Sequence, residues 1–557
     1  MSRNTASRNP AANHQFAVIP RAEIPRSSFR RNYNIKTTFD SGYLIPFFVD
    51  EAVPGDTVTL RATLFGRLAT PIWPVMDNMY LDVFWFSCAE RLLWDNFKKM
   101  MGEQDNPEDS VSYQMPVVRS PAGGFARLGL ADYFGIPPQH SAGGTNATLD
   151  VRASAFRAYN LIWNTWFRDE NLQDSVPVPK DNGPDSESTY VLLRRGKRKD
   201  YFTGCLPWPQ KGTAVLLPLG TTAPLKGNPG AWSGTDITVR TATNAGPSTL
   251  SRSATAANAN VLTEASMSGS AGDNLQFVNP GIDLNVTAPG GTAPYADLSA
   301  ATAATINQIR TAFQVQRLYE RDARGGTRYP EQILAHFGVT SPDARQQRPE
   351  FLGGGTLNIN INPVAKTVAG TLSSTNPPLG SLAAFGTVVG GIPTVIKSFT
   401  EHSIIIGLVM VRADLSYQQG LDKLWSRSSK VDFYWPALAH LGEQAVLSQE
   451  IYLKGDGASG DTTVFGYQER WAEMRYKNNL ITGQMRSSYT TPLDAWHLAQ
   501  NFSTRPTLNS TFIQENPPIS RVIAVPTDPQ FLLDGHVDYI HARPMPTYSV
   551  PGLVDHL

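Results

Sequence analysis

The strongest constraint on the fold is a period-two alternation of side chains that begins at residue 57. Over residues 57–64 every second position is apolar, and threonine or arginine fills the positions between them. The apolar set is Val58, Leu60, Ala62 and Leu64. Successive side chains of a strand point to opposite faces, so the pattern predicts a strand with one buried face. The chain therefore has at least one sheet with a dry side.

Three further stretches predict strands. Residues 356–362 alternate Leu357, Ile359 and Ile361 with asparagine. Residues 80–88 and 403–411 are apolar at most positions, which is typical of strands buried on both faces. The chain also contains 45 Gly and 41 Pro spread along its length, so turns and irregular loops are abundant. These features favour a β-sandwich.

Apolar residues at helical spacing predict helices inside the long connections. The ranges are 90–101, 151–168, 306–319 and 330–337. In the second and third ranges the apolar residues form one stripe, and we expect both stripes to pack into a core rather than to bind a cofactor. The helices therefore serve the fold and not a chemical site.

Charge and cysteine content exclude several classes of protein. The chain has 48 basic and 48 acidic residues, so any contact with nucleic acid must come from a local patch. Cys88 and Cys205 lack the spacing of a zinc site and cannot form a disulfide framework. No run reaches the roughly 18 apolar residues of a membrane-spanning helix. We expect a chain that folds in a cytoplasm, with buried thiols and no membrane insertion.

Three segments depart from the composition of a folded core. Residues 1–36 hold seven Lys or Arg against a single Glu23 and are interrupted by three prolines, which predicts an extended arm over residues 1–40. The arm contacts a neighbouring chain or nucleic acid, or it is a solvated tail. Residues 213–305 are predicted as a surface insertion, since only five charges occur within 241–305. A second, shorter loop insertion is predicted at 363–397, and 41–557 as one domain.

Searches for catalytic or metal-binding motifs give no candidate. The phosphate-binding, nucleophile-elbow and zinc-protease patterns do not occur. His536 and Asp538 share one face of a strand while His541 lies on the other, so these three cannot converge on a metal. Asp456 and Asp461 lie in a short glycine-rich turn that lacks the ligand count of a calcium loop. We predict no catalytic residue, no metal and no cofactor.

Residues 464–487 combine four aromatic residues with six charges. Aromatic and arginine side chains are enriched at protein interfaces, because they bury large areas and keep polar tips for a partner. The mixture suits neither a dry core nor a solvated helix, and it predicts a segment that docks on another surface. The predicted interface residues are Tyr467, Arg470, Trp471, Arg475 and Tyr476.

A dense basic run lies at residues 194–199, with Tyr201, Phe202 and Trp208 close behind it. Phosphates pair with cations while bases stack on aromatic rings, so this combination is typical of single-stranded nucleic acid binding. A solvated run of charges is the alternative. The predicted DNA-binding residues are Arg194, Arg195, Lys197, Arg198 and Lys199.

Several longer runs resemble one family. They include 24–57 (IPRSSFRRNYNIKTTFDSGYLIPFFVDEAVPGDT), 68–107, 196–212 (GKRKDYFTGCLPWPQKG), 464–487, WHLAQNF at 496–502 and ARPMPTYSVPGLVDHL at 542–557. In sequence and in order they are similar to the major capsid proteins of microviruses, the small icosahedral single-stranded DNA bacteriophages, and specifically of the gokushovirus branch. The resemblance covers most of the chain outside 213–305 and 363–397.

The resemblance implies a mainly β fold, the eight-stranded antiparallel viral jelly roll with long insertions that contain short helices. It also implies a structural protein and not an enzyme. Sixty copies would form a T=1 shell around a circular single-stranded DNA genome, after assembly in the cytoplasm of a host bacterium. Implied partners are a DNA pilot protein, an internal scaffolding protein, a small DNA-binding protein and a host surface receptor, which the projecting insertion would contact.

Two other classes fit the composition alone. A β-rich carbohydrate-active enzyme of this size would also be neutral and rich in tryptophan, and it would be a monomer or small oligomer. A phage receptor-binding spike would be a trimer that encloses no DNA. Particle size therefore separates the three predictions.

Overall fold

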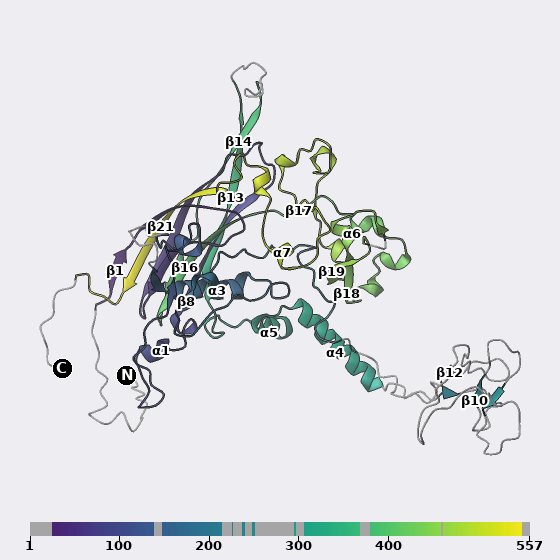
Figure 1. Ribbon diagram of the computed structural model, residues 1–557, viewed down its shortest axis with the longest axis horizontal. Helices are drawn as coiled ribbons and strands as arrows, with labels where there is room; N and C mark the ends of the chain where they lie inside the picture. The colour runs from purple at the N-terminus through teal and green to yellow at the C-terminus, as the bar shows by residue number, and fades with distance from the viewer. Residues whose placement is uncertain are drawn as a thin grey trace, which may run out of the picture. The chain divides into compact units, whose positions relative to one another are not determined.

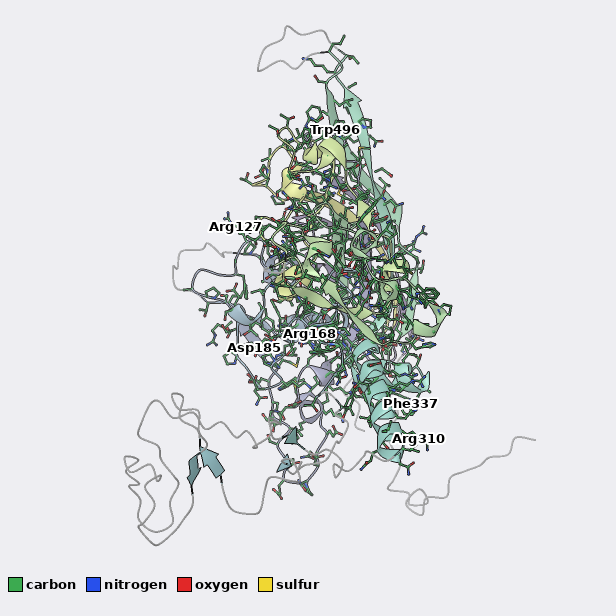
Figure 2. All side chains as sticks on the ribbon, turned by 90° about the vertical axis from the view of Figure 1, so that its right-hand side faces the viewer. Arg127, Arg168, Asp185, Arg310, Phe337 and Trp496 are labelled. Atoms are coloured by element: carbon green, nitrogen blue, oxygen red, sulfur yellow. The ribbon has the colours of Figure 1, made fainter. Side chains whose placement is uncertain are left out.

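The computed structural model describes residues 25–138, 148–213, 215, 225–226, 237–239, 248–250, 295–296, 306–367, 379–457 and 460–548. The chain divides into two compact units, one formed by Met1–Lys211 with Glu320–Leu557 and the other by Gly212–Tyr319. Figure 1 shows the course of the chain, and Figure 2 adds the described side chains. All strands of the large sheet belong to the first unit.

Ten strands form one antiparallel sheet that curls on itself. Its first half pairs β2, β21, β4 and β14 in that order, and its second half pairs β3, β16, β5 and β13. Their bounds are β2 Tyr33–Phe39, β3 Ile45–Ala52, β4 Thr57–Leu68, β5 Met79–Ala89, β13 Glu350–Ala365, β14 Leu382–Gly391, β16 Ser403–Ala413 and β21 Phe531–Arg543. This is the strand order of a jelly roll, so the predicted fold class is confirmed.

The two remaining strands pair with strands already named. β1 (Ser27–Arg30) pairs with β21 next to the part that pairs with β2, and β15 (Val395–Ser398) pairs with β4 next to the part that pairs with β14. The halves join through β13, which pairs with β5 over its first part and with β14 over its last part. That last part, with the start of β14, forms the hairpin that projects beyond the jelly roll in Figure 1.

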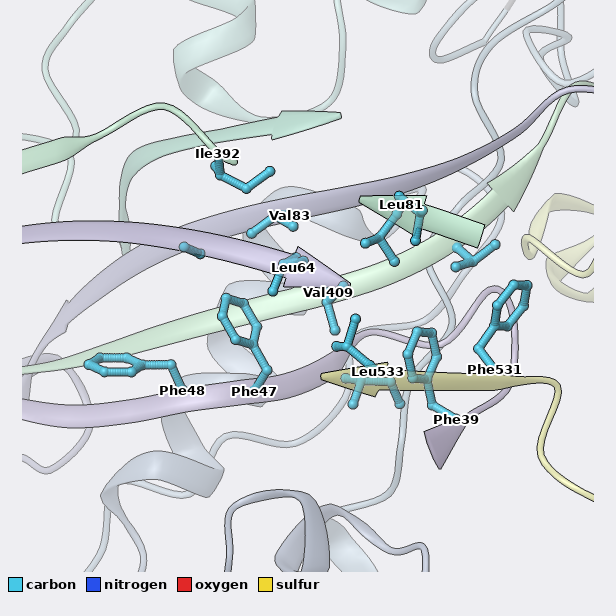
Figure 3. Packing of buried hydrophobic residues seen from close by; sticks show 14 of the residues in the cluster. Phe39, Phe47, Phe48, Leu64, Leu81, Val83, Ile392, Val409, Phe531 and Leu533 are labelled. Atoms are coloured by element: carbon cyan, nitrogen blue, oxygen red, sulfur yellow. The ribbon is translucent and has the colours of Figure 1, made fainter. Parts of the chain in front are cut away.

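The main core lies between the two halves of the jelly roll. Figure 3 shows Phe39, Leu64 and Leu533 from the first half facing Phe47, Val83 and Val409 from the second. All four apolar residues of the 57–64 alternation are fully buried, which confirms the predicted strand and its dry face. Trp85 at the centre has its ring centroid 5.1 Å from that of Phe47 and 5.4 Å from that of Phe48.

A second core covers the outer face of β5 and β16. It is formed mainly by α3 (Ser154–Ile162), the π turn Trp163–Phe167 and α2 (Leu130–Tyr133). Every residue of β16 is buried because helices cover one of its faces and the main core covers the other. The buried Arg157 of α3 pairs at 2.7 Å with Asp185, which is labelled in Figure 2. The stripe predicted at 151–168 does pack into a core.

A third, smaller core lies beside the jelly roll and contains Tyr201, Phe202, Tyr417 and Phe465. The elements around it are short. They are β17 Ser416–Tyr417, β18 Glu443–Leu447, α6 Ser448–Ile451, β19 Val464–Glu469, β20 Asn479–Leu480 and α7 Ser510–Ile513. Figure 1 shows them on the right of the jelly roll. This region contains both the predicted interface block and part of the predicted DNA-binding run.

The remaining helices and strands are also short, apart from α4. Their bounds are α1 Phe97–Met100, β6 Val117–Arg119, β7 Asp150–Arg152, β8 Asp185–Ser186, β9 Leu225–Lys226, β10 Ile237–Val239, β11 Ser248–Leu250, β12 Tyr295–Ala296, α4 Ile306–Arg324 and α5 Tyr329–Phe337. None of the described helices is long and apolar enough to span a membrane. The described residues also contain no cluster of acidic, His or Cys side chains able to hold a metal ion.

The stripe predicted to pack along α4 is not buried in a core, and two of its residues are largely exposed. Ile306 and Phe313 are 76% and 67% exposed, and Ala323 is the buried residue of the helix. Charges at Arg310, Arg317 and around the last turn leave this helix too polar to be covered on most of its surface. The core-packing prediction is therefore wrong for this helix.

Two predicted loop boundaries also differ from the structure. Within the loop insertion predicted at 363–397, residues 382–391 form β14 and residues 395–397 belong to β15. The buried positions of β14 are the small residues Ala384, Gly386 and Val388, which hid the alternation. Within the predicted arm, β1 and β2 already belong to the sheet. Most of the predicted insertion 213–305, and residues 1–24 of the arm, lie outside the described residues.

Candidate assembly and nucleic-acid surfaces

The predicted interface block docks on another segment of the same chain. Trp471 follows β19, adopts a left-handed conformation (φ 70°) and is 3% exposed. Its indole N–H donates a hydrogen bond to the carbonyl of Leu438 (3.0 Å), and its ring meets that of Tyr434 edge to face. The guanidinium of Arg470 stacks on Trp471 and donates to the carbonyl of Val431 (2.9 Å). The block thus fixes residues 431–438 in place.

These contacts divide the five predicted interface residues into two groups. Trp471 is buried within the subunit, and Arg470 and Tyr467 have internal partners, since the backbone of Tyr467 bonds that of Leu206 in both directions (2.8 Å each). Arg475 and Tyr476 are about half exposed, and Arg475 pairs with Glu469. The interface role stays a prediction, and it rests on these last two side chains.

The predicted DNA-binding run begins with a residue that is already bound internally. Arg194 donates from Nη1 to the carbonyls of Ser41 (3.1 Å) and Glu515 (2.9 Å), and its guanidinium stacks on the ring of Tyr43. The first cation of the run therefore joins three distant parts of the chain.

Asp82 of β5 pairs with two more cations of the run. Its Oδ2 lies 3.3 Å from Arg195, 3.7 Å from Arg198 and 2.8 Å from Arg412 of β16. The hydroxyl of Thr356 donates to the other oxygen (2.7 Å). Burial lowers the pKa of Arg195 from its ordinary value, although Asp82 opposes this. One buried carboxylate thus faces three guanidinium groups.

Lys197 is buried near Glu515. The two side chains are 7% and 3% exposed, and the amide of Lys197 donates to the carbonyl of Ile513 (2.6 Å). Burial lowers the pKa of Lys197 and raises that of Glu515 to about 7. A lysine enclosed in this way cannot reach a phosphate outside the subunit.

The DNA contact stays a prediction and rests on the remaining exposed cations of the run. The side chains of Arg198 and Lys199 are 55% and 60% exposed. Lys199 pairs with Asp169 and also donates to the carbonyl of Thr203 (3.1 Å). Sequence composition identified the run, but it could not reveal that buried acidic residues lie beside other cations of the run.

The run and the interface block border one cavity of about 540 Å³. Lys197 and Lys199 line it from one side, and Tyr467 and Tyr476 line it from the other. The rest of the wall carries ion pairs, including Arg328 with Glu170 and Arg324 with Glu443. Cations of the wall are paired with acidic residues, which makes the cavity a structural junction between segments rather than a phosphate site.

Comparison with known proteins decides among the functional classes. The model of the family described as "Capsid protein (F protein)" matches residues 17–553. The chain belongs to this capsid protein family. Proteins named capsid protein VP1 are 46% identical in Bdellovibrio phage phiMH2K, 40% in Chlamydia phage 1 and 35% in Spiroplasma virus 4. Each alignment covers 97% of this chain and 97–98% of the relative.

The resemblance to the microvirus family is thereby confirmed. The chain is a major capsid protein of a small single-stranded DNA phage, a structural component of the virion and not an enzyme. The carbohydrate-active enzyme and the receptor-binding spike are excluded, because family and fold agree over nearly the whole chain. The capsid protein must associate with copies of itself, so contacts between subunits are expected where apolar side chains of the jelly roll and its insertions are exposed.

One surface segment was missed by the sequence analysis. Residues 424–441 carry four large aromatic side chains at Trp425, Phe433, Tyr434 and Trp435, and all four are about half exposed or more. The available signal was an aromatic-rich stretch with neither a strand nor a helix period. Such a stretch cannot bury its rings along one face of a regular element, so exposure was the outcome to expect.

Proposed function

We propose that 60 copies of this capsid protein close a T=1 icosahedral shell around a circular single-stranded DNA genome. The observation that carries the proposal is the agreement of the capsid family over residues 17–553 with the jelly-roll strand order. A chain repeated by closed point-group symmetry makes heterologous contacts about five-fold and three-fold axes and isologous ones about two-fold axes. One kind of subunit therefore suffices to build the shell.

Particle size and shape test this proposal. A shell of 60 subunits of 60.9 kDa has a protein mass of about 3.7 MDa. Sedimentation should give this mass, and electron microscopy should show closed isometric particles. Monomers, trimers or open filaments as the stable end product would contradict the proposal.

We infer that Arg198 and Lys199 face the packaged DNA, since these are the exposed cations of the basic run. Phosphate contacts of this kind are independent of sequence and weaken with salt. Particles of the Arg198→Gln/Lys199→Gln variant should form but hold less DNA per shell. Lys477→Gln removes a lysine that is 80% exposed outside the run and serves as the control. Equal DNA content in all three proteins would favour the solvated-run interpretation.

We further propose that the insertion at residues 213–305 carries attachment to the host surface. Its support is compositional, because a stretch poor in charge and rich in Thr, Ala, Ser and Gly contributes little to a common core. The proposal includes assembly in the bacterial cytoplasm. It also includes contacts with a DNA pilot protein, an internal scaffolding protein and a small DNA-binding protein as the shell is built.

A further inference from the structure

The aromatic segment, residues 424–441, presents an unusual amount of apolar side chain to solvent. Trp425 is 74% exposed, Phe433 53%, Tyr434 47% and Trp435 46%. Three aliphatic residues of the same segment are also more than half exposed, and they are Leu424, Val431 and Leu441. The segment precedes β18 in the green part of the chain in Figure 1. Seven large apolar side chains therefore gather on one short stretch.

The aromatic segment is held firmly on the subunit. Trp471 and Arg470 bind its carbonyls from below, at Leu438 and Val431. Arg427 pairs at 3.2 Å with Glu473, and both of these side chains are nearly buried. Asp432 accepts hydrogen bonds from the backbone of Ser429 and closes a turn within the segment. Exposed rings on such a fixed base lose little conformational entropy when a partner covers them.

The exposed area is large enough for an interface. A large aromatic side chain buries about 150–250 Å² when fully covered, so the four partly exposed rings alone offer about 400 Å². That is about half of what one partner contributes to a standard protein interface of roughly 800 Å² per side. The largest apolar patches on monomeric proteins are of about this size, and they are often functional.

The charges of the segment show which kind of partner fits. Its cations Arg427 and Lys430 have partners within the subunit, because Arg427 pairs with Glu473 and Lys430 lies over the ring of Trp435. Nucleic acid binding needs cations that are free to meet phosphates. The surface instead combines tryptophan, tyrosine and phenylalanine with few free charges, which is the composition of a protein interface core.

We propose that the aromatic segment is a contact between capsid subunits, covered in the shell by a second copy of this chain. The inference rests on the proposed 60-copy shell, in which every copy has the same neighbours and must bury the same surfaces. Trp425 and Phe433 are its principal side chains, since they are the most exposed rings of the segment. Trp471 beneath them positions the segment and does not itself touch the neighbour.

Thiol labelling tests where the segment lies in the particle. Cys88 and Cys205 are 1% and 2% exposed, so a Val431→Cys variant adds the reactive thiol. We expect fast labelling of dissociated subunits and at least tenfold slower labelling of particles assembled from the capsid protein without DNA. Equal rates in subunits and particles would overturn the inference. Slow labelling only in DNA-filled particles would assign the segment to DNA, and slow labelling only with another phage protein would assign it to that protein.

Substitution tests whether the rings drive assembly. Trp425→Ser/Phe433→Ser removes two exposed rings and leaves every hydrogen bond named above intact. Particle yield should fall roughly tenfold or more, because central aromatic contacts dominate interface energies, while circular dichroism and melting of the subunit stay unchanged. The pair Trp425→Tyr/Phe433→Tyr keeps the aromatic area and should assemble. Normal yield from the serine pair would overturn the inference, whereas a wild-type chain that forms no shell would overturn the proposed function.

Discussion

Two glycines in the jelly roll show how single residues set the spacing of its strands. A Cβ added at Gly390 of β14 would lie 2.5 Å from Leu357 of β13, and one added at Gly386 would lie 2.9 Å from Leu68 of β4. Both are closer than van der Waals contact allows. These glycines fill narrow places between strands rather than turns. Their composition predicted a loop, because the sequence does not show which side chains lie opposite these glycines.

Gly354 provides the sharpest test of such close approach. An added Cβ would collide with the backbone carbonyl of Val83 on the paired strand β5, and backbone cannot move aside without breaking the ladder. Gly354→Ala should therefore destabilise the subunit by about 2–4 kcal/mol. Gly391→Ala is the matched control, since its Cβ would lie 3.9 Å from the nearest atom, the carbonyl oxygen of Ala62. Denaturant unfolding of both variants measures the difference, and equal stabilities would contradict this account of the sheet.

The buried Glu515 makes stability depend on pH. Burial raises its pKa to about 7, whereas an unfolded glutamate titrates near 4.3. Between these values the folded chain keeps a proton that the unfolded chain releases. Stability therefore falls as pH rises from about 4.3 to about 7, by up to about 3 kcal/mol for this group.

Glu515→Gln removes this titration and keeps a side chain of similar size. We expect the variant to gain stability relative to the wild type as pH rises from 5 to 8. Subunit melting at both pH values measures the gain, and comparing the two proteins at each pH cancels the contribution of all other carboxylates. A stability difference that does not change with pH would show that Glu515 titrates normally.

At the scale of elements, the interface block shows what composition can and cannot predict. Trp471 and Arg470 of this block bind the chain's own residues 431–438, and the predicted contact of the block with a partner stays a prediction. Contacts within a subunit and contacts between subunits use the same side chains. Only burial in the folded monomer separates Trp471, which is covered, from Tyr476, which is 48% exposed.

Substitutions at Trp471 and at Arg475 should therefore differ in how much they cost the stability of the subunit. Trp471→Ala removes a buried indole and its hydrogen bond, so we expect a loss of about 3–5 kcal/mol in the stability of the subunit. Arg475→Ala removes a side chain that is 52% exposed and should cost about 1 kcal/mol or less. Thermal melting of dissociated subunits compares them. If Trp471→Ala melted like the wild type, the indole would not anchor the aromatic segment.

The predictions of strands and helices were correct where a strong apolar pattern extended over a long segment and neighbouring elements cover it. The alternation at 57–64 and the apolar run at 403–411 became β4 and β16 because neighbours cover the expected faces. The stripe at 306–319 is also periodic, yet Ile306 and Phe313 are exposed and Ile309 and Val315 are only half-buried. Periodicity reports which side chains share a face, but not whether anything covers that face.

At the scale of the whole molecule, the jelly roll could be predicted only through the family resemblance. β2 pairs with β21, and β4 pairs with β21 and β14, so partners lie hundreds of residues apart. Local patterns cannot select such pairings, because closing a long loop costs nearly the same entropy for many alternative partners. The capsid family supplied the strand order that periodicity lacked. The contacts of the basic run with Asp82 could not be predicted from the sequence, because these residues are also far apart in the chain.

The insertion at residues 213–305 is predicted to lie outside the jelly-roll core, so most of it should be dispensable for assembly. Residues 241–299 are poor in charge and rich in small polar residues, a composition that leaves little apolar surface for the jelly-roll core. Replacing them by a short Gly/Ser linker should leave shell assembly intact and abolish attachment to the host. Since the entropy of loop closure grows only with the logarithm of length, subunit stability should shift by about 1 kcal/mol or less.

Particle yield and adsorption to host cells, measured on the same deleted virus, separate the two roles of the insertion. A linker of scrambled sequence and full length serves as the control, because it preserves length while removing any recognition sequence. Failure of the deleted chain to assemble would make the insertion part of a subunit contact. Normal adsorption would move receptor binding to the jelly roll itself, where the projecting hairpin of β13 and β14 is the next surface to test.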